Sequence, residues 1–404
     1  MIIKGQNTCK GHIKNILGKM QGVNKWQYDF LLELFGLLLS IKGRINFLQL
    51  ERYGNHCEQH YRYQFEKAFD FLSFNSELIT EYASRHCTIA FDPSYVSKSG
   101  KATPGVGWYW SGCAGKTKWG LEIGGIAAID IDNHTAFHLE AVQTPNDLQP
   151  GTLLEHYGNT LVERKEQLQT ISKYVVADAY FSKQPFASKL CEHGFELVSR
   201  LRDDANLQYK YNGKQKSGRG RPKKYDGKVD YGNLKMEHFT TVQEDAECRV
   251  YQGIVYSNSL GRDINLVVVY SNNKAQWSHK LYFCTDLDLS GKLVLEYYST
   301  RFQIEFTYRD GKQFTGLNDC QARSENKLHF HFNAALTAVN LAKVTHWISV
   351  PKHQRKPFSL SNIKTVYHNE LLLNRFFSVF GIAPNLKKNK TKIRKLIYYG
   401  AMAA

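Results

Sequence analysis

Four side chains that could bind phosphate or a metal ion recur at helical spacing in the second half of the sequence. Tyr298, Arg301, Glu305 and Lys312 are separated by three, four and seven residues. On a helix that turns about 100° per residue, these steps place the four side chains within an arc of ~60°. A carboxylate flanked by cations suits a site that handles metal ions and phosphates together. The pattern is also typical of a solvated helix with charge pairs, and Gly311 could break the helix before Lys312.

Two aspartates each follow a short apolar run that is typical of a buried strand. Cys87–Phe91 precedes Asp92, and Tyr174–Ala177 precedes Asp178. An acid at the end of such a strand is common in the sites of open α/β sheets, although an aspartate beside a proline also often caps a turn. Together with Glu305, the two aspartates could hold two divalent cations about 3.5–4 Å apart, one at the attacking oxygen and one at the leaving oxygen. Four rival positions do not end comparably apolar strands: Asp130, Asp132, Asp203 and Asp204.

The overall charge of the chain points to a polyanionic partner. Among 404 residues, Lys and Arg number 53 and Asp and Glu number 37, so the formal charge is +16. Nucleic acid is the first candidate for such a protein, although ribosome-associated and membrane-surface proteins show the same excess. Hydrophobic residues make up 42% and aromatic residues 13%, which favours a folded chain of roughly two or three domains over a disordered one.

The cysteines and the apolar runs indicate the compartment. The eight cysteines are scattered without paired spacing, so neither a zinc site nor a disulfide framework is indicated and a reducing cytoplasm is expected. The longest apolar run, Phe30–Ile41, contains Glu33 and is too short to span a bilayer, so we expect a buried helix and no membrane partner.

Residues 1–80 are expected to form helices that could bind DNA. Ile45–Tyr53 and Glu58–Phe69 flank a Gly-Asn turn, which is compatible with a helix-turn-helix whose second helix enters a major groove. In that interpretation, Arg62 and Lys67 contact DNA. Packing in a core explains the aromatic residues of the second helix equally well.

Alternating strands and helices are expected from Cys87 onward. The first three strands are predicted to be antiparallel, and the later alternation is typical of an α/β sheet. The predicted order is strands at 87–91, 121–131 and 135–142, a helix at 153–170, a strand at 174–177, a helix at 182–192 and a strand at 195–201. Residues 209–285 carry further strand-like runs, and long helices are predicted at 325–347 and 365–380.

The three acids and the helical spacing resemble a known family. Asp92, Asp178 and Glu305 occur in the order found in the DDE transposases of bacterial insertion sequences. The spacing around Glu305 is similar to the Tyr-Arg-Glu-Lys signature that defines the group called the insertion-sequence-four family. Further matches are Phe91–Ser94, Lys98–Lys101, Ala177–Tyr180 and Gln321–Arg323. The likeness covers most of the chain, roughly residues 24–378.

The resemblance implies an α/β fold with a ribonuclease H-like catalytic core that is interrupted by an all-β insertion. It also implies an N-terminal helical domain that binds DNA and a set of C-terminal helices. The expected boundaries are 1–80 for the helix-turn-helix-like domain, 81–204 for the first part of the core, 205–288 for the β-rich insertion, 289–350 for the rest of the core and 351–404 for the basic C-terminal helices.

By the same resemblance, the chain is a transposase that cuts the ends of an insertion sequence and joins them to target DNA. Asp92, Asp178 and Glu305 would be its catalytic acids and would bind two Mg²⁺ ions, with Mn²⁺ as a substitute. In-line transfer at phosphorus needs positioned oxygens and neutralised charge more than covalent help from the protein.

The resemblance also assigns the remaining signature residues and the partners. Arg301 and Lys312 would hold phosphates of the terminal nucleotides, and Tyr298 would pack or hydrogen-bond near the point of cleavage. The expected partners are double-stranded DNA, as terminal inverted repeats and as target, and a second copy of the chain in a synaptic complex. The expected location is the nucleoid in a bacterial cytoplasm.

A basic segment within the expected insertion adds candidate DNA contacts. Ser217–Lys224 contains Arg219, Arg221 and Lys223, and its Arg-Gly-Arg-Pro sequence resembles a hook that enters an A·T-rich minor groove. A flexible hairpin that grips phosphates without sequence preference is the simpler interpretation.

Two other functions are compatible with the same residues. The first is a catalytically silent, domesticated DNA-binding protein of the same fold, which the presence of all three acids disfavours. The second is a two-metal nuclease that cuts without strand transfer, which an assay for joining to target DNA would distinguish from a transposase.

Overall fold

β1 (Cys87–Ser97) is the strand around which the sheet of this computed structural model is built. It pairs antiparallel with β3 (Lys116–Asp130) over its whole length, and on its other side it pairs parallel with β5 (Tyr174–Val176). β3 in turn pairs antiparallel with β2 (Gly107–Ser111) and β4 (Thr135–Gln143). The structure describes residues 4–215, 221–273, 276–384 and 386–402.

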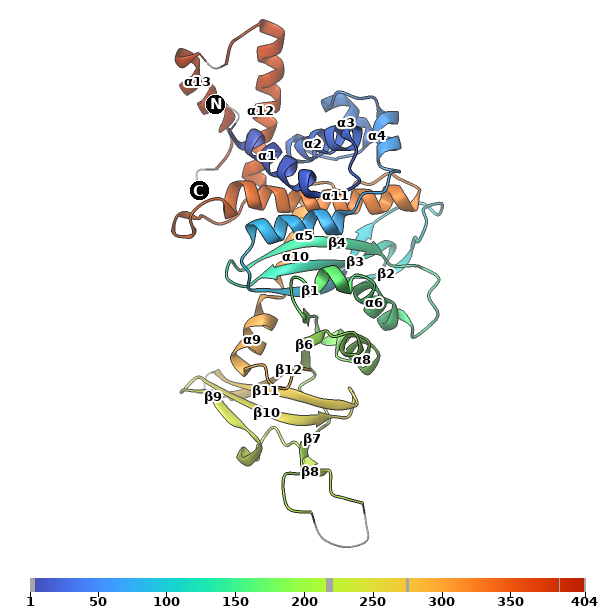
Figure 1. Ribbon diagram of the computed structural model, residues 1–404, viewed down its shortest axis with the longest axis vertical. Coiled ribbons are helices and arrows are strands. Elements are labelled where there is room, and N and C mark those ends of the chain that lie inside the picture. Colours follow the sequence, from blue (N-terminus) through green and yellow to red (C-terminus); the bar gives the residue numbers. More distant parts are fainter. Residues whose placement is uncertain (1–3, 216–220, 274–275, 385, 403–404) are drawn as a thin grey trace.

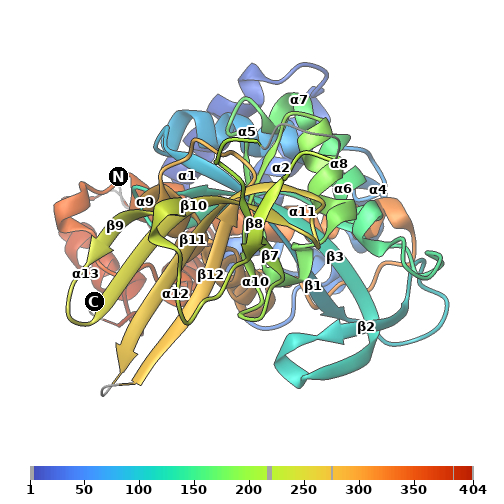
Figure 2. The same cartoon turned by 90° about the horizontal axis from the view of Figure 1, so that it is seen from below.

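β6 (Glu196–Leu201) joins this half of the sheet to a second set of strands. β6 pairs parallel with β5, and β12 (Gln276–Cys284) pairs antiparallel with β6. Beyond β12 the order is β11, β10, β7 and β8, with β9 beside β10, so residues 205–288 extend the central sheet at the lower end of the molecule (Figures 1 and 2). The bounds are β7 (Leu207–Lys210), β8 (Tyr225–Lys228), β9 (Thr240–Glu244), β10 (Cys248–Ser257) and β11 (Arg262–Asn273).

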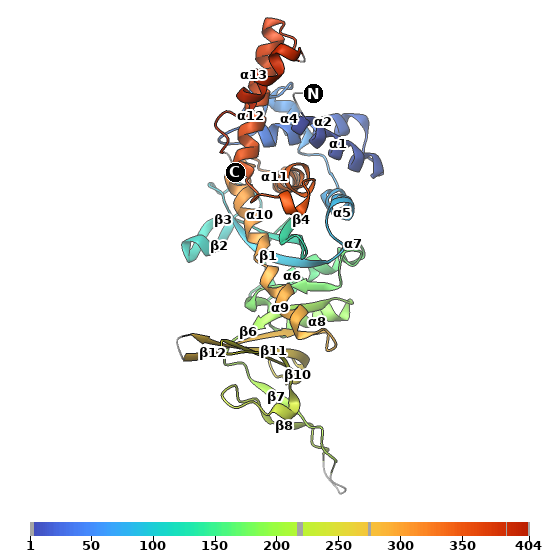
Figure 3. The same cartoon turned by 90° about the vertical axis from the view of Figure 1, so that its left-hand side faces the viewer.

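Helices from both ends of the chain lie above the sheet, and together they are called the helical layer. α2 (Lys25–Ser40) packs against α11 (Glu325–Lys343) and α12 (Leu360–Phe380), and Figure 3 shows α11 over β4 and α2 over α11. The N-terminal helices are α1 (Lys4–Lys19), α2 (Lys25–Ser40), α3 (Phe47–Tyr53), α4 (Glu58–Gln64) and α5 (Phe71–Tyr82). No helix of the described residues is long and apolar enough to cross a membrane.

Two consecutive helices lead from the lower strands back to the helical layer. α9 (Gly291–Thr300) packs against β6 and β12, and α10 (Gln303–Phe314) packs against β1, β3, β4 and α11 (Figure 3). Because α10 crosses the sheet at β1, it can place side chains beside the residues of that strand. The remaining helices are α6 (Leu153–Val162), α7 (Lys165–Leu168), α8 (Gln184–Glu192) and α13 (Lys387–Ile397).

α11 closes the free edge of β4 with polar side chains. The Asn340 side chain accepts a hydrogen bond from the His138 amide at 2.8 Å and donates one to the His138 carbonyl at 2.7 Å. Asn333, two turns earlier on the same face, makes the equivalent pair with Ala141 at 2.8 and 3.0 Å. Both asparagines are fully buried, so their amides replace a neighbouring strand for an edge that water does not reach.

Several elements differ from their sequence-based expectation. The helix predicted over 58–69 ends at Gln64, and Lys67 lies in the following turn, because the amides of Glu66 and Lys67 bond three residues back rather than four. The helix predicted over 153–170 is divided into α6 and α7. The first strand runs on to Ser97, because β3 offers it a partner along its whole length.

Replacing Asn340 with alanine should destabilise the fold. The variant leaves the buried amide and carbonyl of His138 without partners, which costs roughly 2–4 kcal/mol of unfolding free energy. Chemical denaturation of Asn340→Ala measures this loss. Asn326→Ala, an exposed change on the same helix, is the control and should stay within about 0.5 kcal/mol of the wild type; equal stability of the two variants would contradict the proposed role of Asn340.

Candidate active site

Asp92 and Asp178 lie at the same edge of the sheet. The parallel pairing of β1 with β5 covers Ile89 and Ala90 only, and β1 then continues against β3 alone. Asp92 therefore lies where β1 has lost its neighbour on one side, and Asp178 comes two residues after the end of β5. The carboxyl ends of parallel strands are where open α/β sheets place their sites.

The local backbone fixes Asp178 at the start of a short turn. Its side-chain Oδ1 accepts a hydrogen bond from the Tyr180 amide at 2.9 Å and so caps the 3₁₀ turn Ala179–Phe181. Its carbonyl accepts a hydrogen bond from the Ser199 hydroxyl of β6 at 2.9 Å. The second carboxylate oxygen of Asp178 has no hydrogen bond to the described residues, so it is available to a ligand.

The helix predicted to carry Tyr298, Arg301, Glu305 and Lys312 is interrupted at Arg301 and Phe302, not at Gly311. Both residues keep right-handed helical angles, but the amides of Arg301, Ile304 and Glu305 bond three residues back. This tight turn separates α9 from α10. The four signature residues therefore come from two helices and the turn between them, rather than from one straight face.

Arg301 lies between two of the three acids. Its Nη1 is 3.8 Å from Oδ1 of Asp92, and its Nη2 donates a hydrogen bond to Oε1 of Glu305 at 3.1 Å. The side chains of Arg301 and Asp92 are 15% and 19% exposed, whereas that of Glu305 is 55% exposed. Asp92 and Glu305 thus share one buried cation, with Glu305 on the solvent side.

The charges around Asp92 are not fully balanced. Burial raises the pKa of the Asp92 carboxyl to about 7, and although the Arg301 guanidinium lowers it, the negative charges of Asp178 and Glu305 raise it again. Lys312 also lowers this pKa, but less. The pKa of Asp92 therefore depends on the charges of Asp178, Glu305, Arg301 and Lys312. Because it stays raised, an additional positive charge beside Asp92 would stabilise its carboxylate form.

Tyr298 and Lys312 complete the surroundings of the acids. Burial raises the pKa of Tyr298, and its phenol is near both Arg301 and the negative charge of Asp178. Lys312 Nζ donates a hydrogen bond to the Ser94 hydroxyl of β1 at 2.9 Å, and burial lowers its pKa. In the structure, Tyr298, Arg301 and Lys312 thus lie in the surroundings of the three acids.

Tyr308 fixes α10 against β1, and the sequence analysis did not single it out. Its buried hydroxyl donates a hydrogen bond to the Asp92 carbonyl at 2.5 Å. Gly125, which pairs with Asp92 across the sheet, makes room for it: a Cβ there would lie 1.9 Å from the Tyr308 hydroxyl. The consecutive glycines at 124–125, in the middle of a strand, are the signal that could have indicated such a close approach.

The three carboxylates suit hard cations such as Mg²⁺, which prefer oxygen ligands. The carboxylate oxygens of the three acids do not all lie within 4.8 Å of one another, so they do not enclose a single ion. Two ions could still bind, because each needs ligands from only some of the acids.

Among the described residues, the ligand atoms of Asp226, Glu237 and His238 do lie within 4.8 Å of one another. There Lys223 and Lys235 already bind Asp226, at 2.7 and 3.1 Å.

The other predicted DNA contacts lie away from the acids. Arg62 pairs with Glu58 and lies 4.6 Å over the Phe47 ring, while Lys67 lies 4.5 Å over the Tyr63 ring. Arg221 and Lys223 are exposed between β7 and β8, at the lower end of the molecule (Figure 1). Arg219 lies outside the described residues.

Comparison with known proteins identifies a family. The sequence matches the model of the transposase DDE domain over residues 102–341, a range that contains Asp178 and Glu305 and begins after Asp92. No curated protein matches. A similar solved structure is the piggyBac transposase synaptic complex with hairpin DNA, with a TM-score of 0.42 and 11% identity over 100% of this chain and 84% of that one.

Neutralising Asp92 should stabilise the protein at neutral and alkaline pH. The folded pKa of about 7 lies above the ordinary value of 3.8, so the folded state binds the extra proton between those values and loses stability as the pH rises through 7. In EDTA, Asp92→Asn should raise the unfolding free energy at pH 8 by on the order of 2–4 kcal/mol and leave it nearly unchanged at pH 4. Urea denaturation at both pH values tests this; an equal effect at both would contradict the buried charge.

Proposed function

The chain belongs to the transposase DDE domain family, and from this premise we propose that it cuts DNA at the ends of a mobile element and joins them to target DNA. Asp92, Asp178 and Glu305 are its proposed catalytic acids. The observation that carries the proposal is the buried Asp92 carboxyl, which lies beside Arg301 and within the electrostatic reach of both other acids.

Two divalent cations, Mg²⁺ or Mn²⁺, fit these acids by the chemistry of the donors and by the surplus of negative charge around Asp92. When bound, they would supply an activated oxygen nucleophile and would neutralise charge on the phosphate and the leaving oxygen. Asp92, Asp178 and Glu305 are the residues that would hold them.

The residues around the acids bind and orient the DNA strand in this proposal. Arg301 now lies between Asp92 and Glu305, and a bound phosphate would take over its guanidinium as a bidentate partner. Lys312, half-buried on Ser94, offers a second positive charge on the β1 side of the acids. Tyr298, between Arg301 and Asp178, would contact the strand near the point of cleavage.

The rest of the chain is assigned by the same proposal. The antiparallel strands β1, β3 and β4, followed by the parallel strands β5 and β6, support a ribonuclease H-like core. We assign residues 205–288 to an inserted β-rich segment and residues 1–80 to a DNA-binding part of the helical layer. The proposed partners are terminal inverted repeats, target DNA and a second copy of the chain. We also propose that the protein belongs to the insertion-sequence-four group, which the spacing of Tyr298, Arg301, Glu305 and Lys312 supports.

Removing any of the three acids should abolish cleavage and leave DNA binding nearly intact. The substitutions are Asp92→Ala, Asp178→Ala and Glu305→Gln, and the assay is cleavage in Mg²⁺ of a supercoiled plasmid that carries the DNA flanking the gene. Loss of catalytic groups in two-metal sites costs orders of magnitude in rate. Asp204→Ala, at an exposed position beside Arg202, is the control and should cleave normally. Normal cleavage by one of the three variants would remove that residue from the site.

Replacing Arg301 should weaken DNA binding and its dependence on salt. Loss of one phosphate contact lowers the slope of log affinity against log salt by about 0.9. Fluorescence anisotropy with labelled duplex measures both quantities for Arg301→Ala. Arg309→Ala removes the same charge from α10, at an exposed position that pairs with Asp310, and should bind like the wild type. If affinity and slope are unchanged in Arg301→Ala, Arg301 does not contact DNA phosphate and only compensates the negative charges of Asp92 and Glu305.

A further inference from the structure

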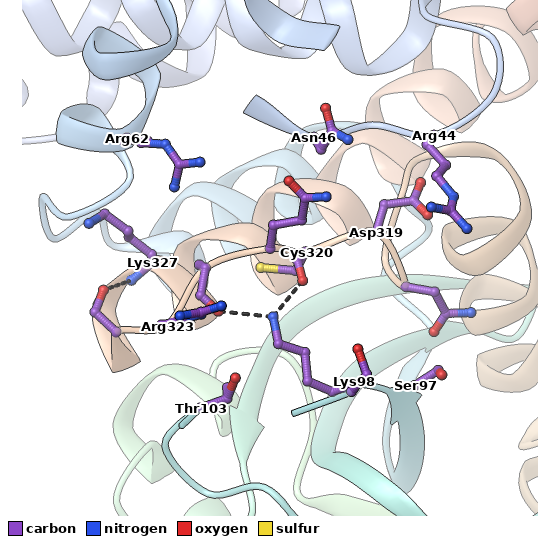
Figure 4. A pocket seen from close by; sticks show the side chains of 15 residues that line it. Arg44, Asn46, Arg62, Ser97, Lys98, Thr103, Asp319, Cys320, Arg323 and Lys327 are labelled. Carbon is purple, nitrogen blue, oxygen red and sulfur yellow. Dashed lines mark hydrogen bonds between the residues drawn. The ribbon is translucent and has the colours of Figure 1, made fainter. Parts of the chain in front are cut away.

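A polar cavity lies at the C-terminal end of β1. It has a volume of about 980 Å³ and is enclosed by three parts of the chain (Figure 4). These are the turn before α3 together with α4, the end of β1 with the following loop, and the segment 318–324 that joins α10 to α11. We call this cavity the basic pocket.

Cations dominate the lining of the basic pocket. Its positively charged residues are Arg44, Arg62, Lys98, Arg323 and Lys327, and Figure 4 shows them around one opening. Within the described part of the chain, Asp319 is the one carboxylate of the lining, and its Oδ2 accepts a hydrogen bond from the Ile45 amide at 2.9 Å. An anionic ligand would therefore be attracted by several cations and opposed by a single, already engaged acid.

Part of this positive charge is held in place by the fold. Lys98 Nζ donates hydrogen bonds to the carbonyls of Cys320 and Ala322 at 2.6 and 2.9 Å, which ties the end of β1 to the segment before α11. Lys327 forms an ion pair with Glu66 at 3.0 Å, and Arg62 forms one with Glu58. These contacts orient cations that come from distant parts of the sequence toward the same space.

Arg44 and Arg323 provide the charge that is free to bind a ligand. Both are exposed, and among the described residues neither side chain has a hydrogen bond or ion pair. They come from opposite walls, Arg44 from the turn before α3 and Arg323 from the residue before the cap of α11. A ligand with more than one anionic group could contact both.

The uncharged lining favours phosphate groups over bases. Ser97, Ser99, Thr103, Asn318 and Gln321 supply hydroxyl and amide groups, and none of the described residues that line the pocket is aromatic. Bases bound by single-strand-binding proteins stack on aromatic rings, whereas backbone phosphates are held by Arg, Lys, hydroxyl and amide groups and by helix N-termini. The N-terminus of α11, a helix of 19 residues capped by Ser324, also opens into this pocket.

The basic pocket is connected to the acids by rigid elements. Lys98 follows Asp92 by six residues along β1, a separation on the order of 20 Å for an extended strand. The segment 318–324 follows α10, which carries Glu305 and Lys312. We propose that the basic pocket binds the sugar–phosphate backbone of the same duplex whose end lies at the acids, with Arg44 and Arg323 as its principal phosphate contacts; this inference rests on the proposed function.

The test compares two double variants that lose the same charge. Arg44→Ala/Arg323→Ala removes both free cations of the basic pocket, and Lys14→Ala/Arg85→Ala removes two exposed cations from α1 and from the residues before β1. The probe is a fluorescein-labelled duplex of about 30 base pairs and mixed sequence, because backbone binding does not require a known recognition sequence. Anisotropy is recorded across a range of salt concentrations, and thermal melting confirms that both variants fold.

The pocket variant should bind on the order of ten- to a hundredfold more weakly than the wild type, and its slope of log affinity against log salt should fall by about 1.8, the equivalent of two phosphate contacts. The control variant should show neither change. If the pocket variant and the wild type share affinity and slope, or if the control loses as much as the pocket variant, the basic pocket is not a backbone site. If the wild-type protein does not bind duplex DNA at all, the proposed function fails together with the pocket proposal. If the wild type binds and the pocket variant binds equally well, only the pocket proposal fails.

Discussion

The buried carboxyl of Asp92 is the group whose charge the surrounding structure must balance. Burial alone raises its pKa, and Asp178 and Glu305 add two more negative charges within its reach. Taking a carboxylate out of water is costly unless cations and hydrogen bonds compensate. Arg301 and Lys312 supply part of that compensation by lowering the pKa of Asp92, which nevertheless stays raised to about 7.

The fold places these charges through backbone contacts more than through the acids themselves. β1 keeps its partner β3 beyond the point where its pairing with β5 ends, so Asp92 has no neighbouring strand on one side although β1 itself stays paired. The Tyr308 hydroxyl on the Asp92 carbonyl, and the glycine opposite it, hold α10 against β1. α11, fixed to the edge of β4 by Asn333 and Asn340, supports α10 from above. The elements that carry the acids are therefore held in position by contacts of other residues.

Local sequence patterns were sufficient to identify most of the helices and strands. Asp178 follows a short apolar strand, and the spacing around Glu305 marked residues of which Arg301 and Glu305 are in contact. The match to the transposase DDE domain confirms the broad family, while the roles of individual residues stay predictions. The three antiparallel strands were also predicted correctly, because each alternates or is continuously apolar.

Features that depend on distant partners could not be predicted in this way. The length of β1 is set by β3, and the break at Arg301 involves residues that keep helical angles, so neither leaves a local signal. The extension of the sheet from β6 to β12 joins residues 80 or more positions apart. The basic pocket likewise collects Arg44, Lys98 and Arg323 from three separate segments, and only the folded chain shows them together.

The central claim, that Asp92, Asp178 and Glu305 share one cation-binding place, can be tested most directly by anomalous diffraction from crystals soaked in Mn²⁺. The account predicts manganese peaks within about 2.0–2.4 Å of carboxylate oxygens from these three residues, with Arg301 displaced from at least one of them. Manganese bound elsewhere, for example at Asp226, Glu237 and His238, with Arg301 still between Asp92 and Glu305, would contradict it.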